Sequence, residues 1–102
     1  MDALTAETAS IRIVVTGAGD DIDRQTRAYA EYRLFSRLVP AREQVGHALV
    51  ALRGGGAHGT PRCAITIALR NGELRTADAR AAHIYDAIDK AVDAAARGVD
   101  QT

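Results

Sequence analysis

Residues 61–99, PRCAITIALRNGELRTADARAAHIYDAIDKAVDAAARGV, read as two strands, the turn between them and a long helix. Apolar residues occupy every second position from 61 to 70, which predicts a strand with one buried face. That face consists of Cys63, Ile65, Ile67 and Leu69. Asn71-Gly72 is a strong hairpin signal, because both residue types tolerate positive φ. Residues 73–79 are therefore expected to return as the antiparallel partner strand.

The remainder of this stretch predicts a helix with a single apolar stripe. Apolar side chains recur every three or four positions, at Ile84, Ile88, Ala91, Val92, Ala95 and Val99. Gly98 is a candidate for the end of this helix. The acidic residues are expected to form a solvated face, made by Asp86, Asp89, Asp93 and Asp100. Asp86 and Asp93 each precede a basic residue by four positions, a spacing that allows ion pairs along the helix.

Toward the start of the chain, the pattern predicts a strand and then a helix. Alternation at Ile11, Ile13 and Val15 indicates a strand over residues 11–16. The GAGDDID segment that follows permits a turn, and it offers an N-cap at Asp20, Asp21 or Asp23.

Residues 22–38 predict the first helix, whose apolar stripe contains Ala30, Leu34 and Leu38. Pro40 is expected to stop it, since proline cannot continue a helix. A second strand is expected over residues 44–53, and the Gly-rich segment after it forms the connection to residues 61–99.

The element order is therefore β-α-β-β-β-α, an α+β fold. A four-stranded sheet with one apolar face offers both helices a common surface, so both are expected to pack on one face and to leave the other open. The first two strands should be parallel, because a helix connects them. Residues 1–10 are expected to form a flexible leader, residues 11–99 a single domain, and residues 100–102 a tail.

The composition excludes several classes of function. Thirteen Lys and Arg balance thirteen Asp and Glu, so the chain has no bulk positive charge to hold it to nucleic acid. The lone cysteine, Cys63, excludes an internal disulfide and a cysteine-based metal cage. The apolar runs are too short to span a membrane, and residues 1–10 do not resemble a signal peptide. The sequence thus predicts a cytoplasmic protein without a membrane partner.

No residue pattern predicts catalysis or a cofactor site. His47, His58 and His83 lack the spacing of metal ligands. The GGGAHG segment connects two strands and precedes no helix, which favours a hairpin loop over a phosphate-binding loop. Cys63 falls on a buried strand face, where a thiol is inert. We therefore expect no enzyme activity, no metal, no cofactor and no small-molecule substrate.

One surface pattern remains on the first helix. Tyr29, Arg33 and Arg37 recur at four-residue intervals, on a stripe rotated away from the apolar one. An aromatic ring among arginines can stack on bases and bind phosphates, which indicates RNA binding. An ordinary solvated helix flank would show the same pattern, since arginine is a good helix former. Across the open sheet face, Arg12, Arg62 and Arg70 could add to an RNA-binding surface.

Four segments together resemble the short ribosome hibernation-promoting factors and ribosome-associated inhibitors, also called protein Y. IYDAIDKAVD (Ile84–Asp93) is similar to the family's MYxAIDxLVDKL helix, and TRAYAEYRL (Thr26–Leu34) resembles its LREYVEEKL. IVVTG (Ile13–Gly17) is similar to the LNITG opening strand. Residues 61–81 share the layout of the family's hairpin and the HADAEAED segment after it.

The resemblance implies a fold akin to double-stranded-RNA-binding domains. It also implies a function: binding the small ribosomal subunit in the channel used by mRNA and tRNA, and stalling translation under stress or in stationary phase. No catalysis and no cofactor would be involved.

The resemblance also assigns site residues. Arg27 and Arg33 match basic positions of the family's first helix, Arg62 matches the basic residue opening the third strand, and Arg97 matches one late in the last helix. Together with the first-helix stripe, the candidate rRNA-binding residues are Arg27, Tyr29, Arg33, Arg37, Arg62, Arg75, Lys90 and Arg97. A continuous positive band joining Arg33, Arg37, Arg62 and Arg75 would support binding in the channel. A patchwork broken by Asp86, Asp89 and Asp93 would favour a divergent member of the fold that binds a protein.

The chain departs from the family pattern in its last helix. DAAARGVDQT stands where the family has a basic stretch, and Ala94 stands where lysine is usual. Because the C-terminal dimerisation domain of long-form members is expected to be missing, self-driven ribosome dimerisation is not expected. The oligomeric state is left open, with a monomer favoured. Two alternatives stay open. One is a divergent member of the fold acting as a protein-interaction or regulatory module, and the other is a ligand- or metal-binding domain that uses the histidines.

Overall fold

The computed structural model describes residues 11–19, 22–56 and 59–100. Its elements are β1 (Arg12–Ala18), α2 (Arg24–Leu38), a 3₁₀ turn η1 (Val39–Ala41), β2 (Val45–Arg53), β3 (Arg62–Leu69), β4 (Leu74–Arg80) and α3 (Ile84–Asp100). The predicted order β-α-β-β-β-α is confirmed. The expected leader, residues 1–10, lies outside the described residues, as do His58 and two of the three candidate N-caps, Asp20 and Asp21.

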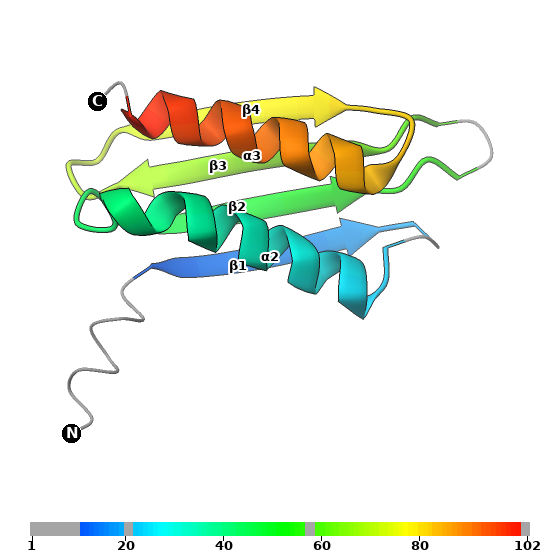
Figure 1. The fold of residues 1–102 in the computed structure, drawn as a ribbon, viewed down its shortest axis with the longest axis horizontal. Helices are drawn as coiled ribbons and strands as arrows, with labels where there is room; N and C mark the ends of the chain where they lie inside the picture. Colours follow the sequence, from blue (N-terminus) through cyan, green and yellow to red (C-terminus); the bar gives the residue numbers. More distant parts are fainter. Residues whose placement is uncertain (1–10, 20–21, 57–58, 101–102) are drawn as a thin grey trace.

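The four strands form one mixed sheet in the order β1-β2-β3-β4. β1 and β2 are parallel, as a helical connection requires, whereas β2-β3 and β3-β4 are antiparallel. Both helices lie side by side on one face of this sheet, with α2 over β1 and β2 and α3 over β3 and β4 (Figure 1). Neither of these helices covers the opposite face, which we call the open face. None of the described helices is long and apolar enough to cross a membrane.

The core lies between the sheet and the helices, and the predicted periodicities fill it. Cys63, Ile65, Ile67 and Leu69 are buried on β3, as predicted. From α2, Leu34 and Leu38 are at most 1% exposed, and from α3 the whole predicted stripe is buried. Full burial of each large aliphatic side chain contributes about 1.5–3 kcal/mol, so these stripes supply most of the folding energy.

The β3-β4 hairpin is confirmed, but its turn differs from the predicted one. The Leu69 amide donates to the Glu73 carbonyl at 2.8 Å, which leaves a three-residue loop instead of two residues. Gly72 alone in this loop has positive φ (95°), and no described non-glycine residue does. Asn71 acts through its side chain, whose Oδ1 accepts from the Glu73 amide at 2.9 Å. The loop is therefore a turn closed by a left-handed glycine, the usual three-residue hairpin.

The ends of the helices also refine the prediction. Asp23 is the N-cap of α2, because its Oδ1 accepts from the amide and the hydroxyl of Thr26, each at 2.8 Å. These hydrogen bonds hold the pKa of Asp23 below its ordinary value. α2 thus begins two residues later than predicted, and Ile22 packs into the core instead. Gly98 does not end α3, which continues to Asp100, the first residue of the expected tail.

Candidate nucleic-acid interface

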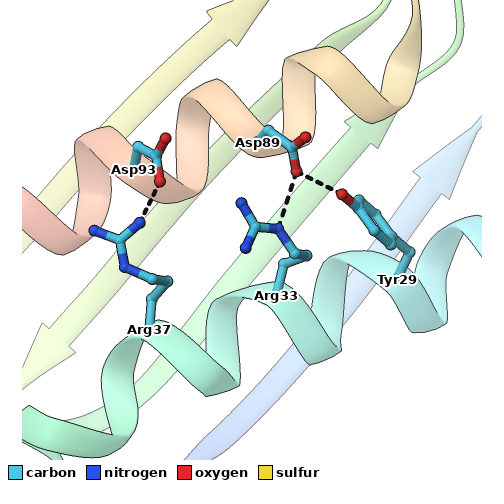
Figure 2. A network of polar contacts seen from close by, with 5 residues as sticks. All are labelled: Tyr29, Arg33, Arg37, Asp89 and Asp93. Atoms are coloured by element: carbon cyan, nitrogen blue, oxygen red, sulfur yellow. Dashed lines mark hydrogen bonds and ion pairs between the residues drawn. The ribbon is translucent and has the colours of Figure 1, made fainter.

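The three residues of the predicted RNA-binding stripe lie on the flank of α2 that faces α3 (Figure 2). Nε of Arg33 donates to Oδ1 of Asp89 at 3.0 Å, and the hydroxyl of Tyr29 donates to the same oxygen at 2.7 Å. Arg37 forms an ion pair with Asp93 one turn further along. We call Tyr29, Arg33, Arg37, Asp89 and Asp93 the interhelix network. Every member of the predicted stripe therefore contacts a carboxylate of α3.

Tyr29 is held by α3 on two sides. Its ring packs edge-to-face on Tyr85, with ring centroids 4.6 Å apart and an interplanar angle of 76°. Its hydroxyl bond to Asp89, together with partial burial, raises the pKa of Tyr29 above its ordinary value. The phenol is thus a fixed donor within the protein, so a base could stack on it only if the contacts with α3 rearranged.

Asp89 and Asp93 are partly exposed but do not form a purely solvated face as predicted, because α2 and α3 run alongside each other and the two carboxylates bind side chains of α2. Carboxylates four residues apart on one helix then face basic residues four apart on the other. A signal for this was available in the sequence, since two helices expected on the same sheet face carried opposite charges at the same spacing. The expected pairs within α3, to Lys90 and Arg97, do not occur among the described residues.

The ion pairs of the interhelix network are weak enough to exchange. The side chains of Arg33 and Asp89 are 31% and 40% exposed, and those of Arg37 and Asp93 are 37% and 44% exposed. Pairs with this much solvent contact contribute about 0–1 kcal/mol each. An arginine can therefore leave its carboxylate for a phosphate oxygen at little cost.

The other candidate residues are scattered over the domain. Arg62 lies on the open face and binds Asp78 through Nε at 2.9 and 3.0 Å and through Nη2. Arg75 lies on the helix-covered side, where it pairs with Glu73 at 2.7 Å and donates to the Gly98 carbonyl at 3.3 Å. Arg27 donates to the Ile22 carbonyl at 3.2 Å. Arg62 and the α2 arginines thus lie on opposite faces of the sheet.

Lys90 and Arg97 complete the candidate set on α3. Both side chains are exposed, and neither forms an ion pair with a described residue. Their surroundings include the exposed carboxylates Asp86 and Asp100 of the same helix. Acidic and basic residues therefore alternate over the helix side, and the structure does not join Arg33, Arg37, Arg62 and Arg75 into one continuous band.

The open face carries a feature that periodicity alone missed. The strand register places Arg53 opposite Arg62, and Arg62 opposite Arg80. We call Arg53, Arg62 and Arg80 the arginine row. A signal existed in the chain, because Arg53 ends one strand and Arg62 begins the next across the Gly-rich loop. Only the register, however, brings Arg80 beside them.

A shallow hollow of about 300 Å³ adjoins the arginine row. It is lined mainly by small side chains and two of the arginines: Thr16, Ala18, Ala51, Arg53, Arg62 and Ala64. At the opposite end of the same face, Arg12 lies opposite His47. The part of the chain that the structure describes holds no group of three or more potential metal ligands.

The fold and these surfaces define a small α+β domain with arginines on two faces. A family model described as sigma 54 modulation protein / S30EA ribosomal protein matches residues 13–102. The chain therefore belongs to this family. Its members are ribosome-associated modulation proteins, and it is not known as an enzyme family. By sequence, it matches none of the curated proteins.

Solved structures share the whole fold. The chain is similar to a ribosomal subunit interface protein from Coxiella burnetii, with a TM-score of 0.73, 20% identity, and 88% of this chain and 94% of the other covered. It is also similar to the Protein Y N-terminal domain from Thermus thermophilus, with a TM-score of 0.70, 29% identity, and 90% and 97% covered. The predicted resemblance to the hibernation-factor family is confirmed.

Proposed function

We propose that this protein is a ribosome-associated translation inhibitor that binds small-subunit rRNA in the channel used by mRNA and tRNA, under stress or in stationary phase. The observation that carries the proposal is the family match over residues 13–102, together with a fold shared end to end with a ribosomal subunit interface protein. The partner is the small ribosomal subunit, and inhibition follows from occupancy of the channel without any chemical step.

On the helix side, Arg33 and Arg37 are the central contacts of this proposal. They reach rRNA by exchanging Asp89 and Asp93 for phosphate oxygens, which accept the same guanidinium hydrogen bonds. Lys90 and Arg97 add exposed cations on α3. Arg27, Tyr29, Arg62 and Arg75 remain candidate contacts that must first leave the intramolecular partners described above. Such binding should weaken with salt, because each phosphate contact releases a counterion.

A nucleophilic role for Cys63 conflicts with its surroundings. The side chain is fully buried, and burial raises the pKa of the Cys63 thiol to about 12. A thiolate is the reactive form, so this thiol is inert at neutral pH. This supports a binding function over covalent catalysis.

The test is co-sedimentation of the protein with purified bacterial small subunits over a range of salt concentrations. We expect the wild type to pellet with the subunits at low salt and the Arg33→Glu/Arg37→Glu variant to remain in the supernatant. The charge-matched control is Arg24→Glu/Arg42→Glu, whose two arginines are exposed and form no ion pair with a described residue. Because the two introduced carboxylates would face Asp89 and Asp93, an Arg33→Gln/Arg37→Gln variant and a thermal melt separate lost binding from lost folding.

Absence of the wild type from the ribosome pellet even at low salt would contradict the proposal. A second candidate would then apply, in which this family member binds a protein. An observation favours that reading: Tyr32 is 68% exposed and Phe35 38% exposed, beside Ala28 and Glu31 on the outer flank of α2. A discrete protein recovered without ribosomes by the wild type, and lost in Tyr32→Ala, would select the second candidate.

A further inference from the structure

We propose that the arginine row on the open face is a second RNA-binding surface, which grips the phosphodiester backbone so that the domain contacts RNA on both faces. The proposal rests on the function proposed above, and it adds Arg53 and Arg80 to the contacts. A protein that occupies a channel faces the channel wall on more than one side. The helix side of this domain can contact only one of these sides.

The geometry of the row suits a polymeric anion. The pairings Arg53↔Arg62 and Arg62↔Arg80 align three arginines perpendicular to the strands. Neighbouring strands lie about 4.8 Å apart, so the row spans roughly 10 Å at the backbone. Arg53 and Arg80 are exposed, and Arg62 is half-buried. Over this width, successive phosphates of one strand can each contact a guanidinium group.

The charge of the row is only partly compensated within the described chain. Directly opposed like charges on neighbouring strands destabilise a sheet. Among the described residues of the open face, Asp78 is the one carboxylate, and Arg62 binds both of its oxygens. Arg53 and Arg80 form no ion pair with a described residue. An anion bound along the arginine row would relieve the repulsion among the three arginines, which Asp78 alone does not fully relieve.

The surface beside the row lets a ligand backbone approach closely. The adjoining hollow is lined mainly by alanines and a threonine, so no large apolar side chain stands above the sheet there. Arginine is suited to such a site, because its planar guanidinium can bind two phosphate oxygens at once.

The charge pattern also argues against a second copy of the chain as the occupant. A copy packed face to face would bring the arginine row against either another arginine row or the corner formed by Arg12 and His47. Both arrangements oppose basic residues to basic residues. Asp78, the one acid among the described residues of this face, is already engaged by its own Arg62. The row therefore requires an anionic partner, and we assign it to an RNA backbone because the proposed partner is rRNA.

The experiment compares the Arg53→Gln/Arg80→Gln variant with the wild type in binding purified bacterial small subunits between about 50 and 200 mM salt. Removing two phosphate contacts should make the slope of log affinity against log salt shallower by about 1.4 to 1.8. Over this roughly fourfold range in salt, the wild type should then lose about tenfold more affinity than the variant. The Arg24→Gln/Arg42→Gln variant loses the same charge away from the row and should keep the wild-type slope.

A thermal melt completes the design, because it separates a binding role from a structural one. Relief of like-charge repulsion should leave the melting temperature of Arg53→Gln/Arg80→Gln equal to or above that of the wild type. Weaker ribosome binding combined with undiminished stability supports the proposal. An unchanged slope in this variant, with the wild type bound to subunits, overturns the second surface and leaves the proposed function standing. A wild type that does not bind subunits overturns both.

Discussion

Neutralising the carboxylates of the interhelix network should strengthen RNA binding while weakening the fold. In the wild type, Arg33 and Arg37 must each break an ion pair before they bind a phosphate. In the Asp89→Asn/Asp93→Asn variant, this cost is absent. The two pairs are partly exposed and contribute about 1–2 kcal/mol together at most. Their removal should therefore tighten binding to small subunits by up to about 30-fold.

The salt dependence of binding gives a second, independent check on this variant. The counterions released on binding come from the RNA phosphates, so their number depends on the phosphate contacts and not on the partner that each arginine leaves. Without the two carboxylates, the slope of log affinity against log salt should therefore stay close to that of the wild type, while the affinity itself rises. The same variant should melt about 4–8 °C lower if the lost interhelix contacts amount to about 1 kcal/mol.

The assay is equilibrium binding of labelled protein to purified small subunits at several salt concentrations, paired with a thermal melt. The control is Asp86→Asn/Asp100→Asn, which makes the same charge change on exposed residues of the same helix that form no ion pair with a described residue. Screening should limit the effect of the control to about twofold. Unchanged affinity in Asp89→Asn/Asp93→Asn, together with a lowered melting temperature, would show that Arg33 and Arg37 do not contact rRNA.

Three further outcomes follow from the core, the N-cap and the thiol. Leu34→Ala should lower the free energy of unfolding by about 3–5 kcal/mol in urea denaturation, since Leu34 is fully buried, and a loss under about 1 kcal/mol would contradict the packing. The pKa of Asp23 is lower in the folded protein than in the unfolded chain, where it lies near 3.9. The ionised Asp23 carboxylate therefore contributes its full stabilisation of the fold above the unfolded-state pKa, and this contribution is lost as the pH falls through the folded-state pKa. The stability difference between wild type and Asp23→Asn, which caps without titrating, should thus shrink between about pH 5 and pH 3, and a constant difference would refute this role. Cys63, with its pKa near 12, should resist alkylation at about pH 8 in the native protein and react after unfolding, and rapid labelling of the native chain would show that it is accessible.

The fold was predictable because the core obeys simple periods. The two-residue alternation in β3 and the apolar stripe of α3, with its spacing of three and four residues, each indicate one buried face. A sheet covered by two helices on one side buries all of these faces. The hairpin was predictable from the Asn71-Gly72 dipeptide, but the length of its loop was not. The Asn71 side chain and the left-handed Gly72 settle the loop through local hydrogen bonds that the dipeptide alone does not specify.

The surfaces were harder to predict, because they depend on tertiary neighbours. Arg33 and Asp89 are far apart in the sequence and become partners only where α2 and α3 run side by side (Figure 2). The arginine row depends on strand register, which aligns Arg80 with Arg62. A neutral chain can therefore carry an electropositive face, since the described residues of the open face include four arginines and one aspartate. Net charge described the whole chain and concealed this asymmetry.

The most direct test of the central claim is a cryo-electron microscopy structure of the protein with vacant bacterial small subunits at low salt. We expect density for the domain in the channel used by mRNA and tRNA, with rRNA phosphates against α2 and against the arginine row. Subunits with an empty channel, or with the domain bound at another place on the ribosome, would contradict the central claim.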